Sequence, residues 1–399
     1  MRRKPKAGAS RCDSKSERAA TAGTGLLIGL IFVCCAVHAQ EFSAPLPIEP
    51  TDAVANIATP YPASYAMVHD FAFGSLIDSA FALVDAASGR FKGMISAGNF
   101  ATLDVSSARQ EFYVGESYYS RGTRGERVDL VSVYDMDNLD RLAEIELPKK
   151  RAAVVVNKGA TAITDSGRFL LVFNLTPGTS VSVVDLEARA FVGEIQTPGC
   201  SLVYPTKIHN FFMLCGDGAL LNVSLNDDGG VLSRAKSAPF IDIDADPLSE
   251  KSSKVGDTWQ FISFRGDVQP IDDEGRPGER WSLTATDERA ANWRPAGWHW
   301  TAGHPDGLLW VGMTPNGYDG SHKDPASEVW LYDVAEQERL QRIRLKTIAL
   351  SIDVTLEEKP RLLVVNAEGA LDIYDARSGD YQRSIYDLGA SPYQVHAMP

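Results

Sequence analysis

The histidines are the first residues to test for chemistry, and none has the spacing of a reaction centre. Six of them lie beyond residue 39: His69, His209, His299, His304, His322 and His396. Compact metal sites use close histidine pairs or an HExxH helix, and the nearest pair, His299 and His304, has neither pattern. The sequence also has no GxSxG elbow, no P-loop and no GxGxxG turn before a helix. We therefore expect no metal site and no catalytic residue in this chain.

One acidic segment resembles the beginning of a calcium loop. Residues 242–250 read DIDADPLSE, with acids at alternate positions. An EF-hand needs glycine at its sixth position and a bidentate carboxylate at its twelfth, where this chain has Pro247 and Ser253. We interpret the segment as a solvated acidic loop.

The N-terminus has the pattern of an export signal. Four basic residues lie within the first six positions, an apolar run GLLIGLIFVCCAV follows at residues 25–37, and Val37-His38-Ala39 satisfies the small-residue rule for signal peptidase. We predict a signal peptide over residues 1–39, cleaved after Ala39, and a periplasmic mature chain. An uncleaved membrane anchor is the alternative, although the run is short for a bilayer.

Charge limits the partners of the mature chain. Residues 1–39 carry seven Lys/Arg and two Asp/Glu, so the remainder has 32 basic and 50 acidic residues and a formal net charge of −18. Such a surface disfavours nucleic acid and anionic membranes. It suits exchange with a soluble partner that carries a positive patch, although a charge excess is also typical of a solvated surface.

Three of the five cysteines precede residue 39, which leaves Cys200 and Cys215. In an oxidising compartment an isolated pair is most simply one disulfide, worth roughly 3 kcal/mol in the chain-entropy model. Two free thiols or half of a metal site are the alternatives.

A short sequence motif, called the phrase below, is repeated along the remaining chain. An alternating apolar run ends on aspartate or asparagine in seven places: Asp85, Asp135, Asp185, Asn226, Asp272, Asp333 and Asp375. A polar turn and a second alternating run usually follow, which is the pattern of a β-hairpin. A further run precedes several hairpins, as in DSGRFLLVFN at residues 165–174. Three or four strands per 40 to 60 residues are typical of propeller blades.

Seven such units predict an all-β protein, a seven-bladed β-propeller over residues 61–399. Residues 40–60 are proline-rich and predict an extended N-terminal arm. The fourth and fifth units are degenerate, and Pro270 indicates an irregular or edge position in the fifth. A pair of β-sandwiches is the competing fold.

Longer motifs carry a family resemblance across most of the chain. They read SYYSRGTRGERVDLVSVYD at residues 117–135, TPGTSVSVVDL at 176–186, PGCSLVYP and FFMLCGDGALLNVSL within 198–225, WSLTATDERAANWRPAGWHW at 281–300, and SHKDPASEVWLYD at 321–333. They resemble the heavy chain of bacterial amine dehydrogenases, the family of the methylamine and aromatic amine dehydrogenases.

The resemblance implies a periplasmic α2β2 enzyme that oxidatively deaminates primary amines to aldehyde and ammonia. The cofactor, tryptophan tryptophylquinone, is then made in a separate light chain, and the electrons pass to a blue-copper protein (a cupredoxin). The resemblance also implies that Cys200 and Cys215 form an internal disulfide. Trp293, Trp298 and Trp300 are then structural or interface aromatics.

Site residues follow from the same resemblance. The residue matching the family's substrate-channel phenylalanine is Phe100; the alternative is a core position in the first blade. Arg121, Arg124 and Arg127 could clamp the light chain through bidentate Arg–carboxylate pairs, or lie in a solvated hairpin. His322 and Lys323 have the same two interpretations. A stand-alone periplasmic propeller without redox activity is the alternative function.

Overall fold

The computed structural model describes residues 55–154 and 156–399. The predicted signal peptide, residues 1–39, and residues 40–54 of the predicted arm lie outside the described residues. Residues 55–60 form no helix or strand, and the Ile57 N–H donates to the Asp137 carbonyl at 2.6 Å. Regular structure begins with β1 at Tyr65.

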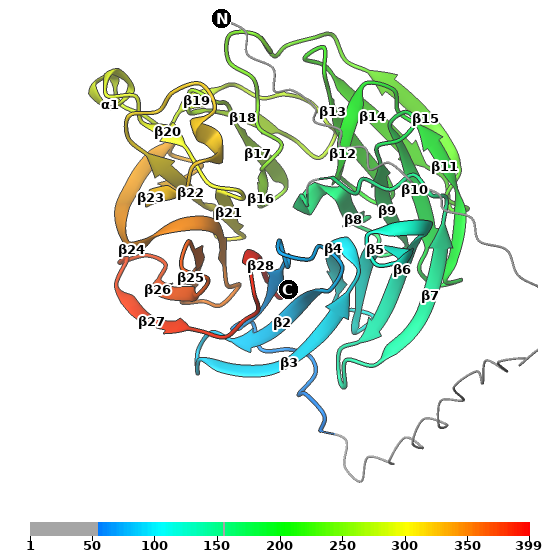
Figure 1. Cartoon of the computed structure of the whole chain (residues 1–399). Helices are drawn as coiled ribbons and strands as arrows, with labels where there is room; N and C mark the ends of the chain where they lie inside the picture. Colours follow the sequence, from blue (N-terminus) through cyan, green and yellow to red (C-terminus); the bar gives the residue numbers. More distant parts are fainter. Residues whose placement is uncertain (1–54, 155) are drawn as a thin grey trace, which may run out of the picture. The chain divides into compact units, whose positions relative to one another are not determined.

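Almost all regular structure within the unit Ala53–Pro399 is β-strand, which forms five four-stranded antiparallel sheets and one eight-stranded sheet. The sheets follow one another around a central axis (Figure 1). The chain is therefore an all-β propeller. No helix of the described part has the length and apolar character that crossing a bilayer requires.

The strands of each sheet are given from the axis outward. The first sheet contains β28 (Pro392–Ala397), β1 (Tyr65–Asp70), β2 (Ser79–Asp85) and β3 (Arg90–Ala97). The second contains β4 (Asn99–Ser106), β5 (Glu111–Arg121), β6 (Arg124–Asp135) and β7 (Arg141–Leu147). The third contains β8 (Thr161–Ile163), β9 (Phe169–Asn174), β10 (Ser180–Asp185) and β11 (Ala190–Gln196).

The remaining sheets continue the same order. The fourth contains β12 (Cys200–Pro205), β13 (Asn210–Cys215), β14 (Leu220–Leu225) and β15 (Val231–Lys236). The fifth contains β16 (Ser253–Val255), β17 (Thr258–Ile262), β18 (Asp267–Ile271) and β19 (Trp281–Ser282). The strands of the sixth sheet are given in chain order instead: β20 (Arg294–Pro295), β21 (Thr301–His304), β22 (Leu308–Thr314), β23 (Ala326–Asp333), β24 (Glu338–Val354), β25 (Arg361–Asn366), β26 (Leu371–Asp375) and β27 (Tyr381–Ile385). Short helical turns are η1 (Lys158–Ala160), α1 (Thr286–Ala290) and η2 (Ser321–Lys323).

The ring is closed by strands from opposite ends of the described chain. β28 pairs antiparallel with β1, which places Val68 opposite Val395. This pairing removes two strand edges that would otherwise be open to pairing with other chains.

β24 makes the sixth sheet twice as wide as the others. Residues 338–344 of β24 pair with β23, and residues 349–354 pair with β25. One long strand is therefore outermost for β21–β23 and innermost for β25–β27. Without the strand, these two groups would be separate sheets.

Antiparallel order decides which loops share a face. We call the end of the ring at which the innermost strands begin the upper face. The connections into each innermost strand and the hairpins between second and third strands lie there, whereas the turns after the third strands lie on the opposite, lower face.

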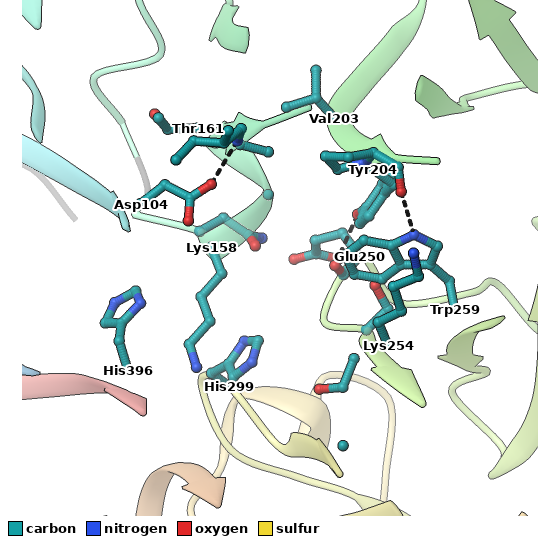
Figure 2. A pocket seen from close by; sticks show the side chains of 18 of the residues that line it. Asp104, Lys158, Thr161, Val203, Tyr204, Glu250, Lys254, Trp259, His299 and His396 are labelled. Atoms are coloured by element: carbon teal, nitrogen blue, oxygen red, sulfur yellow. Dashed lines mark hydrogen bonds between the residues drawn. The ribbon is translucent and has the colours of Figure 1, made fainter. Parts of the chain in front are cut away.

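The innermost strands surround a cavity of about 440 Å³ along the axis. Figure 2 shows side chains from several sheets converging on it, with Lys158, His299 and His396 close to one another and Asp104 and Tyr204 farther round. Residues of all seven innermost strand segments line this cavity.

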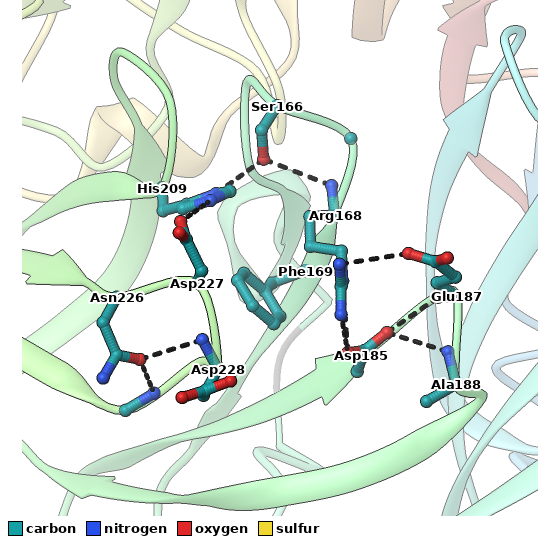
Figure 3. Close-up of polar contacts among 12 residues, drawn as sticks. Ser166, Arg168, Phe169, Asp185, Glu187, Ala188, His209, Asn226, Asp227 and Asp228 are labelled. Carbon is teal, nitrogen blue, oxygen red and sulfur yellow. Dashed lines mark hydrogen bonds and ion pairs between the residues drawn. The ribbon is translucent and has the colours of Figure 1, made fainter.

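The repeated aspartate closes a turn on the lower face. In Figure 3 the Asp185 carboxylate accepts the backbone N–H groups of Glu187 and Ala188 and pairs with Arg168. The other six positions accept backbone N–H groups from the residues that follow them in the same way. A short side-chain acceptor therefore satisfies the donors of the tight turn, which explains why the phrase ends on aspartate or asparagine.

Burial explains why only part of each unit is visible in the sequence. All six residues of β10 are buried, whereas all six residues of β15 are exposed. Second and third strands pack between neighbouring sheets and are strongly apolar, while outermost strands face solvent. Pro270 lies in β18 where the two-residue β19 does not reach it, in agreement with the predicted irregularity.

Candidate functional site

The predicted disulfide is present in the fourth sheet. Cys200 begins β12 and lies directly opposite Cys215 at the end of β13, with the two sulfur atoms bonded. Both cysteines are buried in a large hydrophobic cluster. The bond fastens the innermost strand to its neighbour at the upper face, since β12 begins there.

The other predicted site residues also come to the upper face, although 222 positions separate the first from the last. Phe100 lies in β4 at the start of an innermost strand, and the arginines lie at the hairpin between β5 and β6. His322 and Lys323 form η2, in the connection between β22 and β23. Sequence alone placed these segments in three different units of the repeat.

Phe100 belongs to an aromatic cluster near the axis. Its half-buried ring lies 5.5 Å from that of Phe71, which in turn contacts Phe73 and Tyr393 at 4.5 and 5.4 Å between centroids. Trp298, which precedes β21, packs on Tyr393 at 4.7 Å. We call these five residues the upper aromatic cluster. Phe100 thus lies in the second sheet and packs, half-buried, against Phe71, which follows β1 of the first sheet.

Much of the upper aromatic cluster is covered, but one ring is open to solvent. The exposed fraction of Phe73 is 46%, and its ring contacts both Trp298 and Tyr393. Exposed apolar side chains grouped around an axis mark a surface that another molecule can cover. The segment Phe71–Phe73 had no repeat or motif signal in the sequence and was missed.

The three arginines divide into two kinds. Arg121 and Arg124 are opposite each other at the tip of the β5–β6 hairpin and are exposed. Gly122 between them has φ +73°, a left-handed conformation that glycine adopts without strain. Arg127 instead makes a bidentate pair with the fully buried Asp129, at 2.6 and 2.8 Å. The guanidinium of Arg127 is therefore already paired with a carboxylate of its own sheet.

A second hollow lies beside η2 on the upper face. Its volume is about 540 Å³, and Phe264, Trp300 and His322 are among its lining residues. The His322 ring meets Phe264 edge-on at 6.0 Å, and burial followed by the nearby Lys251 charge lowers the pKa of His322. Lys323 is exposed at the rim.

Lys251 is a buried cation that sequence reasoning missed. Its Nζ lies 4.1 Å from the centre of the Trp300 ring and donates to the Gly297 carbonyl at 2.8 Å. Burial lowers the pKa of Lys251 to about 8. The charge of the adjacent Glu250 opposes this decrease, but burial outweighs it. Trp300 is 1% exposed, which agrees with the structural one of its two predicted roles, and Trp293 packs on Trp330 at 5.0 Å.

The axial cavity holds mixed charges in a polar lining. Lys158 pairs with Asp353 at 2.7 Å, and burial followed by the Lys158 charge holds the pKa of His299 and of His396 well below the usual range. Burial raises the pKa of Asp104 to about 6, against two backbone N–H donors that favour its charged form. His304 lies outside the cavity lining, next to Asp306.

Metal coordination needs converging ligands. Within residues 55–154 and 156–399, no three His, Cys, Asp or Glu side chains converge as metal ligands would. The acidic segment 242–250 forms a largely exposed loop in which Asp242 accepts the N–H groups of Asp244 and Ala245.

Comparison with known proteins covers most of the propeller. The model of the methylamine dehydrogenase heavy chain (MADH) family matches residues 63–398. The methylamine dehydrogenase heavy chain of Methylorubrum extorquens is 29% identical over 352 residues, which cover 86% of this chain and 85% of that protein. The heavy chain of Paracoccus versutus is 30% identical over 318 residues, which cover 78% of this chain and 74% of that protein.

Solved structures add a likeness of fold. The dihydro-heme d1 dehydrogenase NirN in complex with DHE aligns with a TM-score of 0.50 and 17% identity, over 88% of this chain and 77% of that chain. The family predicted from the motifs is confirmed by the match to residues 63–398, which includes every described strand. The chain therefore belongs to the methylamine dehydrogenase heavy chain family.

Proposed function

We propose that this chain is the heavy subunit of a periplasmic quinoprotein amine dehydrogenase whose light chain carries tryptophan tryptophylquinone. The family match over residues 63–398 is the observation that carries the proposal. Two heavy and two light chains would form an α2β2 enzyme, exported by the signal peptide at residues 1–39. The Cys200–Cys215 disulfide supports export because such bonds persist in oxidising compartments.

We further propose that the propeller has seven blades. The division of β24 between β23 and β25 supports this count, since each half of the strand completes a group of three others. The seven turns closed by aspartate or asparagine support it as well, because each follows the third strand of one group.

The proposed reaction consumes a primary ammonium ion and water and yields an aldehyde, an ammonium ion, two protons and two electrons. The light-chain quinone would accept the two electrons. A cupredoxin would then receive them from the quinone one at a time. The heavy chain contributes the surface that holds the light chain and part of the path to the quinone. A net charge of −18 beyond residue 39 supports a redox partner with a positive patch.

We assign the substrate path to the upper aromatic cluster and to Phe100 within it. The cluster is apolar, lies near the axis and leaves Phe73 exposed. An aromatic ring that narrows such a path discriminates amines by apolar contact, at roughly 1–3 kcal/mol per methylene-sized change. Exposed Arg121, Arg124 and Lys323, with half-buried His322, also lie on the upper face and are proposed light-chain contacts.

The test is purification of the chain from its native periplasm under mild conditions. The mass of any bound partner and the visible spectrum before and after adding methylamine or phenethylamine are recorded. A small bound chain whose quinone absorbance bleaches with amine is the expected result. A monomer without a chromophore would instead identify a stand-alone propeller and overturn the proposal.

A further inference from the structure

Arg151 is the largest charged side chain buried in the propeller, with 1% of its surface exposed. It lies between β7 and η1, where its backbone bridges to Asn174 of the next sheet. Burial lowers the pKa of Arg151 to about 10, which leaves the guanidinium charged at neutral pH. Burying such a charge costs several kcal/mol unless charges and hydrogen bonds compensate it.

The guanidinium points at the peptide that carries Phe100. Arg151 Nη2 donates to the carbonyl oxygens of Asn99 and Phe100, at 2.8 and 2.7 Å. Its Nε donates to Ser117 Oγ at 3.3 Å. One planar group therefore fastens two successive carbonyls of β4 to the second strand of the same sheet.

Phe100 needs such support because its backbone is strained. Its φ is +51°, in the left-handed region that is unfavourable for a residue with a side chain. The register between β4 and β5 shifts between Asn99 and Thr102, so Phe100 lies in a bulge without ladder partners. A bulge redirects a side chain, and here it turns the ring toward Phe71.

The residues just before Phe100 are held by buried groups as well. The Glu116 carboxylate accepts the Gly98 N–H at 2.6 Å, and Asn99 Nδ2 donates to the Ser117 carbonyl at 3.1 Å. The Ser79 hydroxyl donates to the Gly98 carbonyl at 2.7 Å. The residues before the bulge are thus held by the adjacent strand of their own sheet and by Ser79 of the first sheet.

Arg151 is itself oriented by the buried Asp129. This carboxylate accepts the backbone N–H of Arg151 at 2.9 Å, the hydroxyl of Ser117 at 2.8 Å and the guanidinium of Arg127. Arg127 also donates a hydrogen bond to the Arg151 carbonyl at 2.8 Å, so the three residues form one hydrogen-bond network. The arginine predicted to hold a partner chain thus supports the residue behind Phe100.

We propose that Arg151 is a positioning residue for Phe100, and that it sets which amines pass the ring by holding the Asn99–Phe100 peptide in its strained bulge. This inference rests on the proposed function of Phe100 as a substrate-path residue. Loss of the two carbonyl contacts frees the bulge to relax toward ordinary strand geometry, which moves the ring. The light chain and its chemistry are left intact.

The experiment compares variants of the complete enzyme, heavy chain with light chain, on methylamine and phenethylamine. Arg151→Lys keeps the buried charge but lacks the planar fork that reaches both carbonyls. We expect it to shift the ratio of kcat/KM for the two amines about fivefold, in the direction of Phe100→Ala, with kcat for the preferred amine within about twofold. In the Phe100→Ala background, Arg151→Lys adds no further shift.

Two further variants keep the test decisive if Arg151→Lys assembles poorly. Ser117→Ala removes the Nε acceptor and one donor to Asp129 but keeps both carbonyl contacts of Arg151, and it should shift the ratio in the same direction by a smaller factor. Arg168→Lys makes the same substitution at an Arg–Asp pair on the lower face, away from Phe100, and should leave the ratio unchanged. Equal loss on both amines, or an additive shift in the double variant, would overturn the positioning role. An unchanged ratio in Phe100→Ala alone would instead contradict the proposed substrate path.

Discussion

Arg127 and Asp129 form a bidentate pair in which the carboxylate is fully buried and the guanidinium is about one-fifth exposed. The two residues lie on the same strand, two positions apart, so their side chains share one face of β6. The same strand begins at Arg124, which is exposed at the hairpin tip. One short motif thus contains a residue that serves the fold and residues that are free for a partner.

Removal of Arg127 should therefore destabilise the propeller. Arg127→Ala leaves the Asp129 charge buried beside fewer donors, and we expect a loss of about 3–5 kcal/mol in the free energy of unfolding. Arg121→Ala, at the exposed tip of the same hairpin, should change it by less than about 0.5 kcal/mol. Urea unfolding of the isolated heavy chains at pH 7 measures both. Equal stability of the two variants would refute the distinction.

The turn at Asp185 predicts an acid-dependent stability. Burial alone would raise the pKa of Asp185, but hydrogen bonds from Arg168 and from the Ala188 and Glu187 N–H groups outweigh it and hold the pKa below 3.8. A carboxyl group with a lowered folded-state pKa stabilises the fold above its unfolded pKa, and this contribution is lost as the pH falls through the folded value.

The matched variants are Asp185→Asn, which keeps a turn acceptor, and Asp185→Ala, which removes it. At pH 7 we expect Asp185→Ala to lose about 2 kcal/mol and Asp185→Asn to lose less. The gap between the native chain and Asp185→Asn should shrink as the pH falls below 4. Urea unfolding between pH 7 and 3 checks this, and a gap independent of pH would contradict the ion-pair contribution.

Lys251 predicts a pH-dependent stability in the alkaline range. Its pKa is lowered to about 8 by burial, from 10.5, so the folded chain holds its proton less tightly than the unfolded chain does. Stability therefore rises with pH between about 8 and 10.5. Relative to Lys251→Met, which lacks this titration, the native chain should gain on the order of 3 kcal/mol across that interval. Paired unfolding curves at pH 7.5 and 10 measure the difference, and a constant difference would refute it.

Phe73 predicts a contact that matters for assembly. Phe73→Ser removes the exposed ring of the upper aromatic cluster, and central aromatic contacts commonly contribute more than 1 kcal/mol to an interface. We expect about tenfold weaker binding of the light chain, measured by dissociation of the purified complex on dilution. Leu340→Ser changes a similarly exposed side chain on β24, far from the axis, and should have no effect. Equal effects of both variants would show that the upper face is not the surface that binds the light chain.

Much of the fold could be predicted because the repeat is local. The run of apolar residues and the aspartate that closes the following turn lie within about ten residues, and both act through neighbouring backbone groups. The third strand of every group was found in this way. Outermost strands such as β15 had a weak sequence signal because their residues face solvent. The length of β24 was not predicted because one continuous strand belongs to two groups of strands.

The candidate site was only partly predictable, for a different physical reason. Phe100 and the Cys200–Cys215 pair were identified from motifs, but neither the strained bulge nor its support by Arg151 has a local signal. Arg151 is 51 residues from Phe100 in the chain, and Tyr393 is more than three hundred from Phe71.

The sequence by itself determined the turns, the buried second and third strands, the cysteine pair and the family. Tertiary structure decided which side chains meet at the axis, because ring closure by β1 and β28 joins segments that no local interaction relates. It also decided that Arg127 serves the fold and Arg121 the surface. Both residues are arginines, and their roles differ only because the buried Asp129 lies beside Arg127.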